Sequence, residues 1–322
     1  MFFNLVVEVS RRWLRSDFLG APLRLTFWLK HALAERQVSK RLASGYGFQT
    51  LGHFWRSRTV TPEKTGRVHI LGSGQSVTEL NATDFELIAR ETSIGLNVWI
   101  AHPFVPDFYS LEGGQLPVTD DEGEHRQFLA AEMSLPRVRA KLPSLLMLRP
   151  PPPHRNEQMV PIPEFFASRT YLTGRANLVR ADSRRGLKID LWALAFLARV
   201  GLLPMNVLPD NGASVVRMMF FALALGCRDI VLSGIDLNEN PYFWYSKPDS
   251  EAHRKLRELF PRATGVPHET TLSTDRPYDT REVIIELAGI LRRYHGVTVW
   301  VGSDSSALAS RLRTFSWPRQ DN

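Results

Sequence analysis

Short apolar runs that end in small or polar residues alternate along the chain with longer apolar stretches of helical spacing. A run of this kind is typical of a buried strand that leads into a loop. The runs predicted as strands are 68–71, 93–99, 144–149, 205–209, 229–234 and 297–302, and the stretches predicted as helices are 190–203, 213–226 and 280–294. Strands that alternate with helices predict an α/β fold, with a mostly parallel sheet covered by helices on both faces.

Other segments do not show a clear period. Residues 112–143 and 150–188 are rich in proline and charge, and we interpret them as crossovers or as excursions above the sheet. Residues 237–279 form a long connection full of polar and aromatic residues, which indicates a lid or a binding loop. The pattern places one α/β domain at 61–322, with the sheet beginning after a helical extension at 1–60.

The positive charge of the chain lies in that extension. The net charge is +7, yet residues 1–60 hold 10 Lys and Arg against 3 Asp and Glu, which leaves 30 of each in residues 61–322. A neutral main domain argues against nucleic acid, whereas a basic, aromatic-rich segment suits an anionic membrane surface. The alternative is one or two helices packed on the main domain with their basic side in solvent.

The expected location is cytoplasmic, peripheral to the inner face of the membrane. No apolar run approaches the roughly 20 residues of a transmembrane helix, and no cleavage site follows an apolar run near the first residues. The single cysteine, Cys227, excludes an internal disulfide and favours a reducing compartment. It lies in an apolar run and is interpreted as a core residue.

An acidic cluster at 120–125 suggests a metal site, because hard cations prefer several carboxylates. Consecutive residues cannot all face one ion, and no apolar strand leads into them. We therefore interpret the cluster as an acidic surface loop, and no metal site is predicted.

Polar residues at the strand ends are the candidates for chemistry. Ligands of open parallel sheets bind outside the carboxyl ends of the strands. The candidates there are the loop Gly72-Ser73-Gly74-Gln75-Ser76, Asn97, Asn211, Ser214, and the loop Gly234-Ile235-Asp236. The sequence therefore predicts that these residues gather at one edge of the sheet.

Each candidate also has a structural interpretation. Glycines in the first loop would let backbone amides face a phosphate or a ribose, but the loop lacks the third glycine of a dinucleotide fingerprint and the lysine of a P-loop. Ser76 and Glu79 could instead form a capping box. Ser214 begins an apolar helix, where an anion is favoured, or it caps that helix. Asp236 could accept hydrogen bonds from ribose hydroxyls, or it could cap a turn.

Together these motifs resemble the bacterial sialyltransferases of glycosyltransferase family 42 over roughly residues 67–312. The resemblance rests on VHILGSGQS, on GLNVW, on the block GASVVRMMFFALALGCRDIVLSGID and on VTVWVGSDSSALASRL. It implies a Rossmann-like variant of the GT-A fold and an inverting, metal-independent transfer of sialic acid or a related 3-deoxy-2-ulosonic acid. The implied donor is a CMP-activated sugar, and no further cofactor is implied.

The resemblance also implies a glycan or glycolipid acceptor, as in lipooligosaccharide or capsule biosynthesis, and a set of residues around CMP. These residues are Gly72, Ser73, Gly74, Ser76, Asn97, Ser110, Asn211, Ser214, Gly234 and Asp236. Three positions depart from the family, which favours Pro at Gln75, Arg at Asn211 and Asn at Ser110. The lid tyrosines that assist departure of the phosphate are matched loosely by Tyr242 and Tyr245, which could equally be packing aromatics.

A histidine is the base that the resemblance implies for the acceptor hydroxyl. His268, in HETTLSTD, is its counterpart, with two extra residues before the next helix. An ungapped alignment from the last strand places Asp279 there instead. Two alternative functions remain: a related transferase that glycosylates flagellin or acts on pterin phosphates, and an inactive nucleotide-binding scaffold. The oligomeric state is left open between a monomer and a homo-oligomer.

Overall fold

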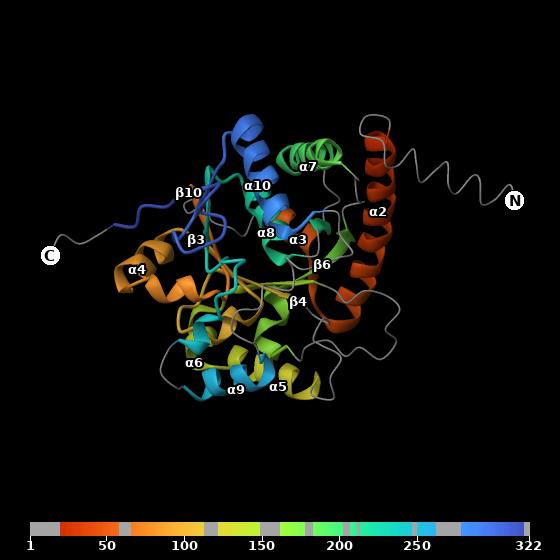
Figure 1. Cartoon of the computed structure of the whole chain (residues 1–322). Helices are drawn as coiled ribbons and strands as arrows, with labels where there is room; N and C mark the ends of the chain where they lie inside the picture. Colours follow the sequence, from red (N-terminus) through yellow and green to blue (C-terminus); the bar gives the residue numbers. More distant parts are fainter. Residues whose placement is uncertain are drawn as a thin grey trace, which may run out of the picture.

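A parallel sheet forms the centre of the protein (Figure 1). The computed structural model describes residues 20–57, 66–112, 122–148, 162–177, 183–201, 207–210, 213–246, 250–261 and 278–318. Within these ranges the strand order is β1-β6-β5-β4-β3-β2-β8-β9-β10, with β7 beside β6, and each of these pairings is parallel. The strands are β1 (Gln49–Thr50), β2 (Arg67–Leu71), β3 (Thr92–Leu96), β4 (Phe108–Glu112), β5 (Ser144–Leu148), β6 (Thr170–Asn177), β7 (Val207–Asp210), β8 (Asp229–Ser233), β9 (Thr298–Val301) and β10 (Arg313–Thr314).

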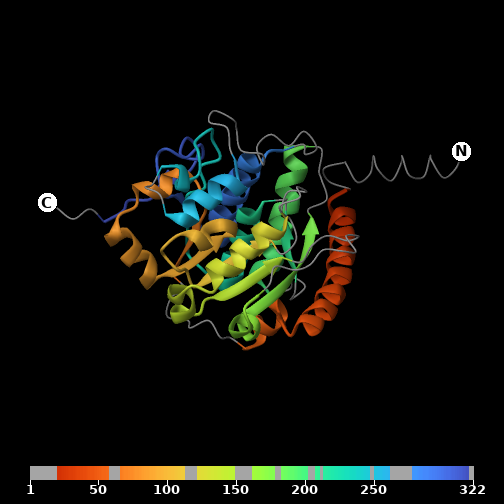
Figure 2. The ribbon, with the colours of Figure 1, turned by 90° about the horizontal axis from the view of Figure 1, so that it is seen from below.

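Helices cover both faces of this sheet, so the predicted α/β class is confirmed (Figures 1 and 2). In Figure 1, α7, α8 and α10 lie above the sheet with α2 at its side, and α4, α5, α6 and α9 lie below it. The helices are α2 (Gly20–Tyr46), α3 (Leu51–Ser57), α4 (Ala82–Arg90), α5 (Glu122–Met133), α6 (Pro136–Lys141), α7 (Arg184–Arg199), α8 (Ser214–Leu225), α9 (Glu251–Leu259) and α10 (Thr280–Ile290).

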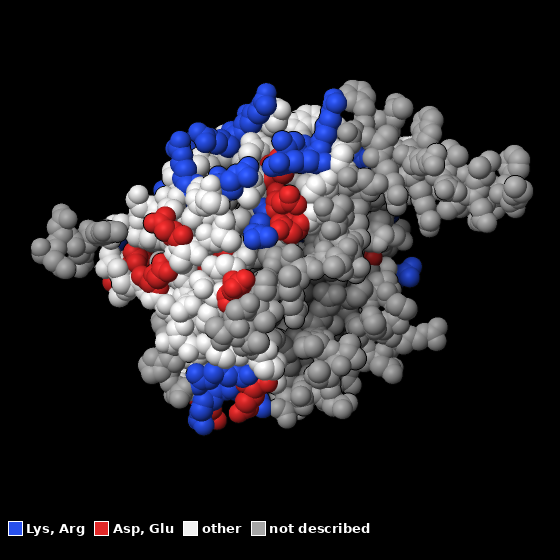
Figure 3. Space-filling model, viewed as in Figure 1, with Lys and Arg blue, Asp and Glu red and all other residues white. Residues whose placement is uncertain are grey.

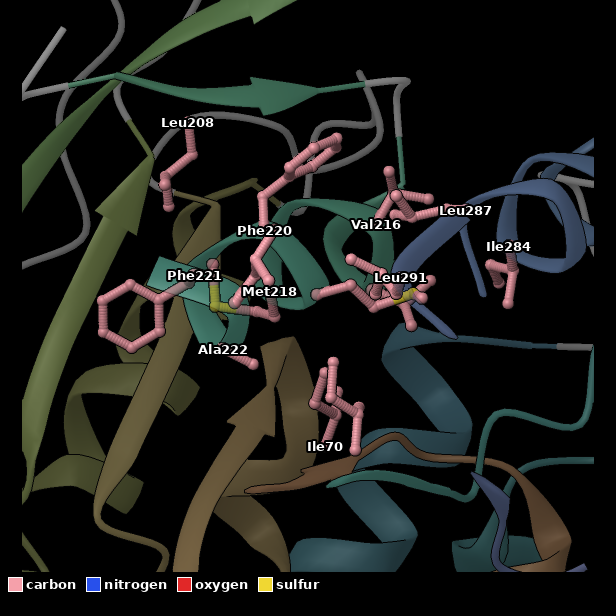
Figure 4. Close-up of a cluster of buried hydrophobic side chains, with 14 of the residues drawn as sticks. Ile70, Leu208, Val216, Met218, Phe220, Phe221, Ala222, Ile284, Leu287 and Leu291 are labelled. Atoms are coloured by element: carbon pink, nitrogen blue, oxygen red, sulfur yellow. The ribbon is translucent and has the colours of Figure 1, made fainter. Parts of the chain in front are cut away.

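Alternation along the strands divides the buried side chains into two main cores. Ile70 of β2 and Leu146 of β5 belong to the core under α7, α8 and α10, whereas their neighbours Leu71 and Leu145 face the opposite core. Figure 4 shows the first core, where side chains of the apolar helix α8 lie between the sheet and α10. Burial on both faces explains why the strands read as nearly unbroken apolar runs.

The N-terminal segment packs on the sheet. Helix α2 buries a residue every three or four positions, among them Arg24, Trp28 and Ala32, and it lies against β6. After it, β1 pairs with β6 and Phe54 of α3 enters the core. The sheet therefore begins at Gln49, earlier than the sequence predicts. For residues 20–57 the structure matches the alternative of helices packed on the main domain.

The predicted elements are present, with three differences. The run predicted as a strand at 93–99 leaves the sheet after Leu96 and continues as a 3-10 helix, Asn97–Ala101. Helix α7 begins at Arg184, six residues before the predicted start, where Ser183 caps it by accepting a hydrogen bond from Gly186. Helices α5 and α6 form the crossover from β4 to β5, but the segment 150–188 contributes strand β6.

His69 is a buried, titratable side chain within the sheet. Its Nε2 lies 2.6 Å from Oε2 of Glu91, and its ring stacks on Trp317 at a centroid distance of 5.9 Å. The guanidinium of Arg67 donates to the other oxygen of Glu91 at 2.8 Å. Burial is the largest influence on His69 and lowers its pKa, although Glu91 opposes that shift. The folded protein therefore favours the neutral imidazole.

We expect His69 to make the fold sensitive to mild acid. In the unfolded chain a histidine takes up a proton near pH 6.5, roughly the reference value, whereas folded His69 does so only at lower pH. The unfolded state then binds more protons, so the free energy of unfolding should fall between pH 7 and pH 5.5, as measured by urea denaturation. His69→Gln should reduce this fall, and His53→Gln, at an exposed position, should not. An unchanged pH dependence in His69→Gln would contradict the assignment.

Candidate functional site

The carboxyl edge of the sheet is the candidate site. Strand β2 lies between β3 and β8, so the chain leaves β2 toward one side and returns much later to the other. This reversal of strand order is a topological switch point. The loops on its two sides diverge, and ligands of open α/β sheets bind there. The loops that follow β2 and β8 meet at this point.

Close contact between these two loops explains their glycines. The amides of Gly72 and Gly74 donate to the carbonyl oxygens of Ser233 and Gly234, both at 2.8 Å. A Cβ at Gly234 would lie 2.3 Å from the carbonyl oxygen of Gly72, and Gly234 has a φ of +68°. The sequence predicts that the amides of the first loop face a phosphate. In the structure the amides of Gly72 and Gly74 instead form hydrogen bonds within the protein, because the two loops extend the pairing of β2 with β8.

Ser76 and Asp236 join the same loops through their side chains. The Ser76 amide donates to Oδ2 of Asp236 at 2.9 Å, and the Ser76 hydroxyl donates to Oδ1. Both residues are buried. Asp236 therefore holds the first loop in place, and its two carboxylate oxygens both accept hydrogen bonds from Ser76.

The alternative capping box of Ser76 and Glu79 is not formed. The short helix Gln75–Glu79 has Gly74 as its N-cap and no side-chain cap. Glu79 instead accepts hydrogen bonds from the hydroxyl groups of Ser303 and Ser305, at 2.5 and 2.8 Å. The capping box lies five residues further on, at the start of α4, where Asn81 and Asp84 bond reciprocally. Glu79 thereby ties the first loop to the segment after β9.

Asn97 and Ser214 come together across the sheet edge. Asn97 directly follows β3, has a φ of +48° and is exposed. Its Nδ2 donates to the Ser214 hydroxyl at 3.4 Å, and Ser214 is the first residue of α8. The polar side chain predicted after β3 and the serine predicted at the start of the apolar helix thus form one contact, 117 positions apart in the sequence.

Arg217 is part of this contact, although it is not among the site residues predicted from the sequence. Its side chain is 1% exposed, and its Nη2 donates to the Ser214 hydroxyl at 3.2 Å. The signal was available, because Arg217 is the only charged residue in the apolar stretch 213–226. A guanidinium in the first turn adds positive charge to the positive end of the helix, and both favour an anionic group.

Ser110 lies beneath the edge. It belongs to β4, pairs with Leu96 of β3 and is 1% exposed. Its hydroxyl has no hydrogen-bond partner among the described residues. The structure therefore places Ser110 beside the residue that precedes Asn97, inside the sheet and not on its rim.

The described part of the lid segment is attached to the first loop. Tyr242 forms an isolated antiparallel bridge with Gly74, and the Phe243 amide donates to the Ser73 carbonyl oxygen at 3.0 Å. The ring of Tyr242 stacks on Trp244 at 4.5 Å. The Tyr245 hydroxyl donates to the carbonyl oxygen of Phe260, after α9, at 2.9 Å. In this conformation Tyr245 therefore uses its single donor within the lid segment.

Asp279, the alternative base, caps α10. Its Oδ1 accepts a hydrogen bond from the Glu282 amide at 2.8 Å, and its Oδ2 forms an ion pair with Arg281 at 2.8 Å. A local role therefore accounts for a carboxylate at this position. His268 and Asn211 lie outside the described residues.

The structure confirms that Cys227 is a core residue, but it does not show the acidic cluster as a loop. Cys227 is buried, and burial raises the pKa of its thiol to about 12, so it is protonated at neutral pH and fills the core. Residues 122–125 begin helix α5 and are not a loop, whereas 120 and 121 lie outside the described residues. Across the described ranges, no three His, Cys, Asp or Glu side chains gather as a metal site would require.

A hollow at the opposite edge is separate from this site. It has a volume of about 450 Å³ and lies where β3, β4, β5 and β6 begin. Thr92, Asp107, Ser144 and Arg169 are among the residues that line it. The carboxyl edge remains the candidate site, because the predicted polar residues meet there and the hollow contains none of them.

Comparisons with known proteins give weak structural matches. No protein-family model and no curated protein matches the chain by sequence. Solved structures that match include the sialyltransferase CstII from Campylobacter jejuni in complex with cytidine-5'-monophosphate, at 14% identity and a TM-score of 0.38, over 77% of this chain and 84% of that chain. The MAf glycosyltransferase from Magnetospirillum magneticum AMB-1 matches at 18% identity and a TM-score of 0.42, over 89% of this chain and 38% of that chain.

Proposed function

We propose that the protein is a glycosyltransferase that uses a CMP-activated sugar. The observation that carries this proposal is the group of Asn97, Ser214 and Arg217 at the carboxyl edge. A helix start, a buried guanidinium and two neutral hydrogen-bonding side chains together suit the phosphate of a nucleotide. Asn97 is exposed at the rim, so a ligand can approach its side-chain amide from solvent.

The same geometry gives the two loops a supporting role. Because the amides of Gly72 and Gly74 and the carboxylate of Asp236 are bonded within the protein, they fix the floor of the site. The half-buried ring of Tyr242, which stacks on the buried ring of Trp244, directly follows this floor. The choice of CMP and of sialic acid or a related 3-deoxy-2-ulosonic acid rests on the sequence resemblance, as do inversion, metal independence and a glycan or glycolipid acceptor.

Ligand-induced stabilisation tests the donor. CMP without divalent metal should raise the midpoint of thermal unfolding, because a ligand that binds only the folded state stabilises it. UDP, GDP and NAD are the comparison ligands. Stabilisation by UDP with manganese and none by CMP would contradict the proposal.

Asn97→Ala and Ser214→Ala should each weaken CMP binding. Loss of a hydrogen bond to a charged group costs roughly 1.5–3 kcal/mol, which is about 10- to 150-fold in the dissociation constant. Isothermal titration gives that constant, and the unfolding midpoint without ligand shows whether the fold is intact. Ser310→Ala is the control, since Ser310 is exposed and bonds only locally to Ala307. Unchanged CMP affinity in both site variants would leave Asn97 and Ser214 with structural roles only.

An inactive scaffold is the second candidate. The observation that favours it is that Tyr245 and Asp279, two of the proposed catalytic side chains, each have a local structural partner. Catalysis then depends on His268 and Tyr242. A protein that binds CMP but neither transfers nor hydrolyses a CMP-activated sugar would support the scaffold.

A further inference from the structure

An exposed apolar stripe runs along helix α7. Trp192, Phe196 and Val200 follow one another at intervals of four residues and are 43%, 48% and 46% exposed. Tyr294, in the π-helical turn Leu291–His295 after α10, is 54% exposed. Large apolar side chains exposed singly are ordinary, but a contiguous group of them marks an interaction surface.

The three rings are in contact through Trp192, and Val200 follows Phe196 one helical turn later. The rings of Trp192 and Phe196 stack at a centroid distance of 6.1 Å with an interplanar angle of 20°. The ring of Tyr294 meets Trp192 edge-on at 6.3 Å and 71°. The surface is therefore assembled from two elements that are more than 90 positions apart in the sequence. We call these four residues the aromatic ridge.

Cations surround the aromatic ridge. In Figure 3, Lys and Arg side chains gather along the top of the molecule, over α7 and α10. Glu286 of α10 is ion-paired with Arg184 and with Lys188 of α7, and Asp190 is ion-paired with Arg24. The exposed cations of α7 and of the turn after α10 are Arg184, Arg185, Lys188, Arg199, Arg292 and Arg293.

We propose that the aromatic ridge docks the protein on an anionic lipid surface. Trp and Tyr favour the boundary between acyl chains and water, and each cation near an anionic bilayer adds attraction. A second copy of the chain is a poor occupant, because a two-fold interface would set Arg185, Arg199, Arg292 and Arg293 of one copy against the same cations of the other. Residues 1–19, with three Arg against one Glu and one Asp, do not complement this charge either.

The position of the aromatic ridge leaves the candidate site open. Helix α7 starts after the carboxyl end of β6, so Phe196 and Val200 lie toward the amino edge of the sheet. Tyr294 precedes β9 and lies toward the same edge. Asn97 and Ser214 lie at the carboxyl edge. Lipid docking would therefore hold the protein without covering the nucleotide, and the inference does not depend on the proposed function.

Flotation of the full chain with vesicles tests the proposal. Vesicles of phosphatidylcholine alone are compared with an equal mixture of phosphatidylcholine and phosphatidylglycerol. The parent should float with the anionic vesicles and be released by high salt. Trp192→Ser combined with Phe196→Ser should weaken binding by more than about tenfold, and Arg292→Gln combined with Arg293→Gln by roughly fivefold for each cation.

A matched control separates the aromatic ridge from other exposed aromatics. Phe27→Ser removes a ring that is 53% exposed on α2, and it should leave vesicle binding unchanged. Each variant should keep the parent's midpoint of thermal unfolding. If the double variant of Trp192 and Phe196 does not, Trp192→Gln alone replaces it. Parent-like binding by the folded ridge variants overturns the proposal. So does binding that is lost only on deletion of residues 1–19, a monomer–dimer equilibrium that the ridge variants abolish, or binding to a DNA duplex in preference to vesicles.

Discussion

Asp190→Ala is expected to lower the free energy of unfolding by about 3–5 kcal/mol. Arg24 of α2 is 1% exposed, and its guanidinium donates to both oxygens of Asp190 of α7, at 2.6 and 2.9 Å. Burial raises the pKa of Asp190 although Arg24 opposes the shift, so the charged pair itself is costly to bury. Removing the carboxylate leaves a buried cation without this partner, and urea denaturation at neutral pH measures the loss.

Two further variants show whether the loss comes from the buried charge. Arg24→Met combined with Asp190→Leu removes both charges and keeps the volume, so its stability should approach that of the parent. Glu258→Ala breaks the exposed pair of Lys255 and Glu258, at 3.5 Å, and should cost less than about 1 kcal/mol. If Asp190→Ala were as mild as Glu258→Ala, the buried pair would not hold α2 against α7.

The pair of Arg24 and Asp190 shows why the packing of α2 on the sheet could not be predicted from the sequence. Its buried positions include Arg24, Glu35 and Ser39 beside Trp28 and Ala32, so no apolar stripe of helical period appears in the sequence. A charge can be buried when its partner is close, and that partner lies 166 positions away. Strand β1 was missed for another reason, since two residues are too short to show any alternation.

Strands β2, β3, β5, β8 and β9 were predictable because they are buried on both faces, whereas β4 and β6, which also lie inside the sheet, were not among the predicted runs. An apolar run that ends in a polar residue marks both the strand and its carboxyl end, and from this the sequence alone placed Asn97 and Ser214 at one edge. The bonding of the loops was not predictable. A glycine indicates close approach of the backbone, but the sequence does not indicate whether a ligand or another loop approaches Gly72 and Gly74.

His268→Ala is expected to lower turnover of a CMP-activated sugar by roughly 10²- to 10⁴-fold, with CMP affinity within a few-fold of the parent. A positioned general base contributes about that factor. A histidine base acts as the neutral imidazole, so with His268 as the base the parent's rate should rise with pH through a group that titrates near the histidine reference of roughly 6.5. That rise should be missing from the variant. Steady-state kinetics from pH 5.5 to 8.5, roughly one unit below the reference to two units above it, measures both effects.

Asp279→Asn is the decisive comparison, because it separates the two candidate bases without breaking α10. Asparagine keeps the side-chain oxygen that accepts the hydrogen bond from the Glu282 amide, and Asn is as good an N-cap as Asp. Only the negative charge beside Arg281 is lost, so the free energy of unfolding should change little. If Asp279→Asn abolishes turnover in a folded protein while His268→Ala retains it, the base is the carboxylate. If neither change lowers turnover, the acceptor hydroxyl loses its proton to another group, and the proposed role of His268 is wrong.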